Sequence, residues 1–346
     1  MPLSLISSAI VAVLLGIAGM ARAEDQPETA PDPHPAGANQ PAGPEKSRTG
    51  PESLAPHLPA PEPPAKSPPP GSGRDEPGRT EPAAGPATES AQRAAVRLQA
   101  LVTRGDALLT QLAQEGADEA NCKRELQGII FDFEDFLRAC PKDAMGHTAF
   151  GRLLGKVGMR RESVAMLLKA NQLDPDIPFV KNQLGNYLAE EGKALEAVNY
   201  FLAAIRLAPR EALYHYQLGT LLHEARDDFL KSGDWKRAAL DQAMHDAFRR
   251  AADLAPDNFA FAYRYAESFY DIDPPHWDEA LKVWGELEDR CAPGLEKETV
   301  RLHAANILLK QGRIDHARLL LNAVSDEKLA AQKQKLLDQL PAAPEK

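Results

Sequence analysis

The sequence predicts an all-α fold, an α-solenoid of stacked helical hairpins, and three observations carry this prediction. Several residue types recur at a fixed step of 34 residues. The recurring residues are Pro141, Pro175 and Pro209; Gly151, Gly185 and Gly219; and Leu154, Leu188 and Leu222. Between them, apolar residues follow helical spacing, as in the stretch 179–188. All 21 aromatic residues lie between Phe131 and Trp284, so the part that folds is expected to span about 91–340.

The amino-terminal residues 1–23 predict a secretory signal peptide. Residues 5–21 are mostly apolar, and Ala21-Arg22-Ala23 places small residues just before an acidic, Pro-rich stretch. We therefore expect cleavage after Ala23 and export of the remaining chain, to a periplasmic or extracellular location. Retention of residues 5–21 as a membrane anchor is the alternative, because this run is barely long enough to span a bilayer.

Residues 24–90 predict a disordered, Pro-rich linker. They hold 18 of the 29 prolines and no aromatic residue, so they bury too little apolar surface to offset the entropy of ordering. Their 11 acidic and 5 basic side chains give a net charge of −6, and the whole chain carries −10. Nucleic acid is therefore not expected as a partner, since phosphate binding needs a basic excess.

The repeated unit has the properties of a helical hairpin. Gly192-Lys193 interrupts the helical pattern after the first helix, and Pro209 ends the second, because proline disfavours helical geometry in the residue before it. Gly185 and Ala197 lack bulk, so the two helices of one hairpin can approach closely. A single hairpin is too small to bury its own apolar face, and stacked neighbours bury it for one another.

These units resemble tetratricopeptide repeats. The residues that carry the resemblance are Leu184-Gly185-x-x-Leu188, Ala197-x-x-x-Phe201 and Pro209, with weaker matches around Phe150-Gly151, Leu218-Gly219, Tyr265-Ala266 and Ala304-Ala305. The resemblance implies a right-handed α-solenoid of about five repeats over 144–325. N-terminal helices or a degenerate repeat at 91–143 would precede it, and a capping helix at 326–340 would follow.

The third hairpin, 212–256, is predicted to be elongated. The distance from Pro209 to Pro256 is 47 residues, an excess of 13 over the repeat, and the excess divides almost equally on either side of Gly233. We expect both helices to be longer by about two turns, with Asp234 as the cap of the second. A flexible loop at 227–234 is the alternative.

No motif of catalytic or cofactor chemistry stands out in the sequence, so we expect no enzyme activity, no cofactor and no metal site. Metalloprotease, hydrolase and phosphate-loop motifs are lacking. Cys122, Cys140 and Cys291 are an odd set that forms no disulfide framework. His215 and His223 are eight residues apart on one predicted helix, but two histidines are weak evidence for a metal.

The resemblance implies a binding surface, because the first helix of each hairpin lines the concave groove in this family. The repeat phase places on that face Arg152, Asn182, Asn186, Tyr216, Thr220, His223, Tyr263, Glu267, Tyr270 and Asn306. Asparagine is a poor helix former, and tyrosine offers a large contact area with a polar tip, so both types favour a peptide-binding role here. Tyrosines that fill the core between repeats are the alternative.

The expected function is therefore a non-enzymatic scaffold, exported from the cytoplasm, that binds a protein or peptide partner in the concave groove. The alternative is an accessory subunit of an envelope assembly or secretion complex that docks through the convex face or the long hairpin. An enzyme whose catalytic residues escape recognition is the third and weakest hypothesis.

Overall fold

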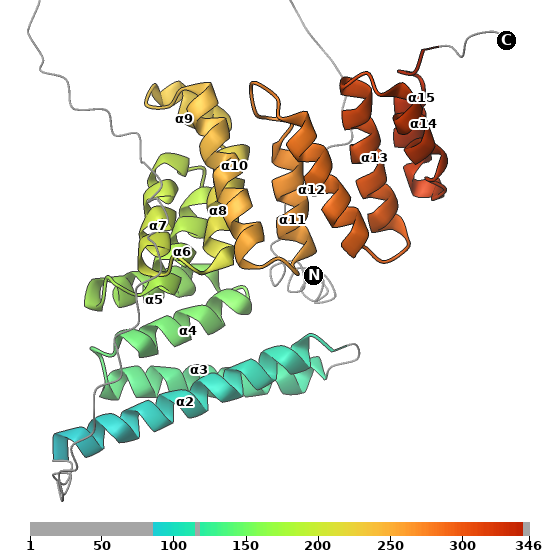
Figure 1. Ribbon diagram of the computed structural model, residues 1–346. Coiled ribbons are helices and arrows are strands. Elements are labelled where there is room, and N and C mark those ends of the chain that lie inside the picture. Colours follow the sequence, from blue (N-terminus) through green and yellow to red (C-terminus); the bar gives the residue numbers. More distant parts are fainter. Residues whose placement is uncertain (1–85, 115–117, 342–346) are drawn as a thin grey trace, which may run out of the picture. The chain divides into compact units, whose positions relative to one another are not determined.

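The computed structural model describes residues 86–114 and 118–341, and within these ranges the regular structure is entirely helical (Figure 1). The predicted signal segment 1–23 and residues 24–85 of the predicted linker lie outside the described ranges. The chain divides into two compact units, residues 1–166 and 167–346, and helix α5 (Arg160–Leu173) spans their boundary. Among the described residues, no helix has the length and apolarity that crossing a membrane requires.

In the first unit, α2 (Pro86–Leu112) and α3 (Glu119–Ala139) form a long antiparallel hairpin against which α4 (Ala144–Lys156) packs. Helix α2 begins at Pro86, inside the stretch predicted as linker. Two ion pairs, Arg97–Asp135 and Arg104–Asp132, join the hairpin at 2.6 Å each. Its apolar side chains make one core with those of α4.

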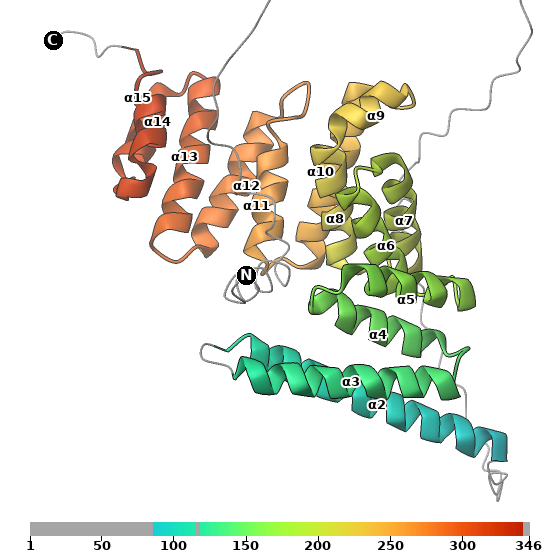
Figure 2. The same cartoon turned by 180° about the vertical axis from the view of Figure 1, so that it is seen from behind.

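The second unit stacks helical hairpins in sequence order, as the views from both sides show (Figures 1 and 2). The hairpin partners are α6 with α7, α8 with α10, α11 with α12, and α13 with α14. The helices are α6 (Pro178–Glu190), α7 (Ala194–Leu207), α8 (Ala212–Glu224), α9 (Arg226–Ser232), α10 (Arg237–Leu254), α11 (Phe259–Ser268), α12 (Trp277–Arg290), α13 (Leu295–Lys310), α14 (Ile314–Asn322) and α15 (Ala330–Leu337). The all-α solenoid predicted from the repeat is confirmed.

Glycines in the first helix of a hairpin permit close approach to an aromatic ring of the second. A Cβ added to Gly185 would lie 3.0 Å from the ring of Phe201, and one added to Gly219 would lie 2.8 Å from the ring of Phe248. Both rings are 1 % exposed. The glycine recurrence in the sequence therefore has a direct steric cause, since any larger side chain would have to displace a buried ring.

The third hairpin differs from the prediction of two lengthened helices. Helix α8 keeps the 13 residues of α6, and the chain then breaks at Ala225 and forms the separate seven-residue helix α9. Gly233 ends α9 in the left-handed conformation, with φ of 82°. Helix α10 begins after Lys236, so Asp234 is not its cap. The inserted residues thus make a new helix, which contacts α7, α8 and α10.

The carboxyl-terminal end is closed by a short 3-10 helix (Glu327–Leu329) and α15. Glu298 of α13 fixes the preceding turn: its carboxylate accepts the backbone N–H groups of Ser325 and Asp326, each at 2.7 Å. These hydrogen bonds hold the pKa of Glu298 below its ordinary value. Leu329 of the 3-10 helix is buried in one apolar cluster with Leu321 of α14, so the cap covers the last hairpin.

Candidate functional site

Seven of the ten predicted face residues lie on consecutive first helices of the second unit. Tyr216, Thr220 and His223 belong to α8; Tyr263 and Glu267 belong to α11 and Tyr270 to the turn after it; Asn306 belongs to α13. All seven are half-buried. We call this set, together with Arg264 of α11 and His303 of α13, the tyrosine strip. Its members share hydrogen bonds, ring contacts and electrostatic interactions, as the next paragraphs describe.

Tyr216 joins α8 to α11. Its ring stacks on Phe261, with centroids 4.7 Å apart, and meets the edge of Phe248 at 5.8 Å. Helix α11 is set in place at its start, where the Asn258 side chain accepts the N–H of Phe261 as an amino-terminal cap. Burial raises the pKa of Tyr216, and the positive charge of Arg264 opposes this shift. The phenol on α8 and the guanidinium on α11 therefore interact electrostatically.

Four neutral side chains of the strip form a hydrogen-bonded group, namely Tyr263, Tyr270, His303 and Asn306. The Tyr263 hydroxyl and Nε2 of His303 are 2.8 Å apart, and Asn306 Nδ2 donates to the Tyr270 hydroxyl at 3.2 Å. The His303 ring lies flat on Trp284, with centroids 4.4 Å apart and an interplanar angle of 2°. Burial raises the pKa of Tyr263 and Tyr270 to about 12 and lowers the pKa of His303. The group is therefore uncharged at neutral pH, with side chains fixed in orientation.

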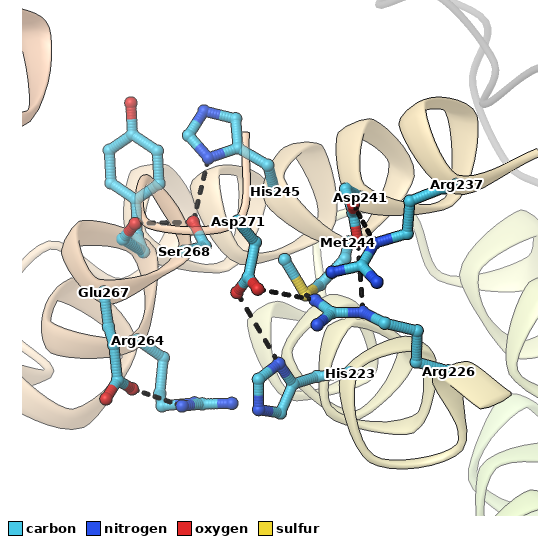
Figure 3. Close-up of polar contacts among 11 residues, drawn as sticks. His223, Arg226, Arg237, Asp241, Met244, His245, Arg264, Glu267, Ser268 and Asp271 are labelled. Carbon is cyan, nitrogen blue, oxygen red and sulfur yellow. Dashed lines mark hydrogen bonds and ion pairs between the residues drawn. The ribbon is translucent and has the colours of Figure 1, made fainter. Parts of the chain in front are cut away.

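Charged residues border the strip where α8, α9, α10 and α11 meet (Figure 3). Asp241 of α10, whose side chain is 6 % exposed, lies 3.1 Å from Nε of Arg226 and 2.5 Å from Nε of Arg237. Arg226 also reaches Asp271, with Nη2 at 2.9 Å from Oδ1. The other oxygen of Asp271 is 3.8 Å from Nδ1 of His223. We call these five residues the Asp241 cluster.

Arg264 connects the cluster to the rest of the strip. It pairs with Glu267 one turn later on α11, and its guanidinium lies over the ring of Phe248, 5.0 Å from the centroid. Figure 3 shows this pair beside His223. Burial first and Arg264 second lower the pKa of His223, while Asp271 and Glu267 oppose the shift. Charged residues of the Asp241 cluster and of the tyrosine strip therefore both act on His223, so the two sets are electrostatically coupled.

The remaining three predicted residues lie elsewhere. Arg152 is on α4 in the first unit, where it pairs with Asp106. Asn186 is half-buried on α6. Asn182, which the repeat phase placed on the concave face, is buried at 1 % exposure, and its amide atoms make no hydrogen bond within the described structure. As the helices stand, Asn182 is not presented to a partner.

Sequence reasoning missed six residues of this neighbourhood: Arg264 and His303 in the strip, and Arg226, Arg237, Asp241 and Asp271 in the cluster. His303 lies three residues before Asn306, so the same helical phase that selected Asn306 could have found it. Arg226 and Asp241 lie within or beside the insertion, where the repeat gives no phase.

The strip offers groups of the kinds that bind a partner. Within residues 86–114 and 118–341, no three histidine, cysteine or acidic side chains gather closely enough to hold a metal ion. His245 and Ser268 form a hydrogen bond of 2.8 Å, but they are 6 % and 3 % exposed and lie within the packing of α10 against α11. The strip instead offers aromatic surface, hydroxyl and amide groups, and one ion pair, a composition typical of protein interfaces.

Comparisons with known proteins agree with this structure. The tetratricopeptide repeat family matches residues 180–211. A TPR repeat-containing protein of Treponema pallidum (strain Nichols) is 32 % identical over 114 residues, which are 32 % of this chain and 14 % of that protein. Among solved structures, YrrB, described as a TPR protein with an unusual peptide-binding site, superposes with a TM-score of 0.50 at 18 % identity, over 60 % of this chain and 97 % of YrrB. The pilF protein of Pseudomonas aeruginosa gives 0.49 at 14 % identity, over 71 % and 99 %.

The matched repeat and the solenoid fold make this chain similar to tetratricopeptide repeat proteins, and the family itself is matched at residues 180–211. The chain spans only about a seventh of the length of this curated relative. The fold is one that suggests a scaffold for protein–protein interaction, with a protein or peptide as partner.

Proposed function

We propose that this chain is an exported, non-enzymatic scaffold that binds a protein or peptide partner on the tyrosine strip. The observation that carries the proposal is the half-buried set of tyrosines and polar groups on consecutive first helices, α8, α11 and α13. Tyrosines held in this way combine contact area with little loss of side-chain freedom on binding, because their orientation is already fixed. The hydrogen bonds of His303 to Tyr263 and of Asn306 to Tyr270 supply that fixation.

Two further features support a binding role for this face. Thr220 of the strip is half-exposed, and Glu224, one turn later at the end of α8 and beside the strip, is exposed, so polar groups on and next to the strip are accessible. The solved TPR structure with the TM-score of 0.50 is itself described as having a peptide-binding site. Export is proposed from residues 1–23 alone, and amino-terminal sequencing of the mature protein is expected to begin at Glu24.

Site-specific photocrosslinking tests the binding face. A photoreactive amino acid at Glu224 should capture the partner in cells that produce the full chain. The same amino acid at Leu319, which is 68 % exposed on α14, is the matched control and should capture nothing reproducible. Mass spectrometry of the crosslinked product identifies the partner segment, which is then synthesised as a peptide. Capture at Leu319 alone would place the partner on the second helices and contradict the proposal.

Affinity measurements with that peptide complete the test. Thr220→Arg puts a long cation in the middle of the strip and should weaken binding at least tenfold, or about 1.4 kcal/mol. Asn199→Arg, on the exposed side of α7, is the control and should bind as the unchanged protein does. Thermal melting of both variants separates lost binding from lost folding. Equal affinity for both folded variants would refute a site on the strip.

A further inference from the structure

His223 lies where three helices and two kinds of charge meet. It is in the last turn of α8, on the tyrosine strip, with a side chain 37 % exposed. Asp271 and Glu267 approach it from the α11 side, together with the guanidinium of Arg264, and Arg226 approaches from the start of α9 (Figure 3). Glu224, the next residue on its own helix, is exposed.

Three carboxylates around His223 already have an arginine partner. Asp271 pairs with Arg226, Glu267 pairs with Arg264, and Asp241 of α10 lies between Arg226 and Arg237. Three positive and three negative charges therefore balance while His223 is neutral. A proton on His223 adds a fourth positive charge between Arg226 and Arg264, while Asp271, whose carboxylate lies 3.8 Å from Nδ1 of His223, is already paired with Arg226.

The weakest point of this arrangement is the attachment of α9. The helix has seven residues and packs mainly through Phe229, which is fully buried against the edge of Trp235. Its other anchor is Arg226, the single side chain that links α9 to both Asp241 of α10 and Asp271 after α11. Repulsion that displaces Arg226, or attraction that draws Asp271 toward a protonated His223, therefore acts directly on α9.

We propose that His223 and the Asp241 cluster form an acid-sensitive switch, in which protonation of His223 loosens α9 and the turn after α11. The proposal concerns the conformation of this chain and does not depend on the identity of any partner. A fall in pH would then change the carboxyl-terminal end of α8, and with it part of the tyrosine strip.

The direction follows from linkage. Burial, Arg264 and Arg226 lower the pKa of His223 from its ordinary 6.5, and Asp271 and Glu267 only partly oppose them. We call the conformation with α9 attached the closed form and the one with α9 loosened the open form. Because His223 binds a proton more weakly in the closed form, protonation shifts the equilibrium toward the open form. The closed form is thus fully favoured above about pH 6.5 and loses its advantage as the pH falls from there toward the lowered pKa.

Hydrogen exchange measured by mass spectrometry at pH 7.5 and pH 5.5 tests the switch. After correction for the intrinsic exchange rate, peptides that cover α9 should lose protection at the lower pH, by up to about tenfold, because one proton changes an opening equilibrium by at most tenfold per pH unit. Peptides from α6 and α7 in the same protein are the internal reference. They report any general loss of stability from other buried histidines, such as His215 and His245.

Three substitutions decide the outcome. His223→Gln keeps the size and removes the charge, so the specific loss in α9 should vanish. His223→Lys carries a permanent charge and should leave α9 weakly protected even at pH 7.5. His316→Gln, at an exposed position on α14, is the control and should behave as the unchanged protein does.

An α9 that loses protection equally with and without His223 would overturn the proposal, as would an α9 that keeps its protection at pH 5.5 in the unchanged protein. If His223→Lys fails to fold, the comparison between the unchanged protein and His223→Gln is sufficient by itself.

Discussion

Replacement of Gly219 by alanine tests whether close helix approach explains the glycine recurrence. The new Cβ would lie 2.8 Å from two ring atoms of Phe248, which is 1 % exposed and has no free space to enter. Overpacking of this kind costs about 2 kcal/mol, and the better helix propensity of alanine returns about 1 kcal/mol. We therefore expect Gly219→Ala to lower the free energy of unfolding by about 1 kcal/mol and the melting temperature by about 3 °C.

Gly285 provides the matched control, because it lies in the middle of α12 with nothing within 4 Å of an added Cβ. There the propensity gain is unopposed, so Gly285→Ala should raise the melting temperature by about 3 °C. Circular dichroism melts of both variants measure the difference of about 6 °C. Equal melting temperatures would refute the steric explanation. A Phe248→Leu background should shrink the penalty of Gly219→Ala, since a smaller side chain leaves room for the methyl group.

Three further predictions concern buried polar groups. Asp241→Ala leaves two arginines without their shared carboxylate and should cost about 3 kcal/mol in urea denaturation; a loss below about 0.5 kcal/mol would mean that the ion pairs contribute little. Burial lowers the pKa of His215 and His245 below 6.5, so unfolding takes up protons and stability should fall as the pH drops below 6.5, by at most about 1.4 kcal/mol per pH unit for each histidine. Glutamine at both positions should flatten this dependence, and a pH profile that does not change would contradict it. Tyr263→Phe removes only the hydroxyl bonded to His303 and should cost about 1 kcal/mol in the same denaturation assay; a neutral result would show that this bond does not hold the ring.

The repeat phase predicted the hairpins because each recurring residue has one local cause. Gly185 and Gly219 face aromatic rings, and the prolines follow the ends of helices. The same phase explains a contact that the sequence analysis did not predict: His147 and His215, two steps of 34 residues apart, each place Nε2 against the carbonyl of a proline six residues earlier, at 3.2 Å and 3.0 Å. Periodicity is thus a reliable guide wherever a residue interacts within its own repeat.

Periodicity is a poorer guide to the candidate site, because the exposure of each side chain depends on the side chains that pack against it from neighbouring helices. Asn182 and Asn186 are one helical turn apart on α6, yet Asn182 is buried and Asn186 is half-exposed. The insertion lies outside the repeat altogether, so its helix α9 and the arginine at its start were not foreseen. Residue type was also a poor guide to burial. Tyr263 and Tyr270 are neither fully exposed nor fully buried, and their hydroxyl groups form hydrogen bonds.

The ion pairs of the Asp241 cluster are related to the insertion, because they attach the inserted helix α9. Buried ion pairs gain little over apolar packing of similar volume, so a hairpin of ordinary length has no energetic reason to contain them. Helix α9 changes the balance because it is short and brings few apolar contacts beyond Phe229, and Arg226 attaches it to α10 and to the turn after α11 at once. The same attachment places a charged group beside His223 on the tyrosine strip. A structure that fastens α9 through charge therefore also makes that attachment sensitive to any new charge on the strip, whether a proton or a side chain of a partner.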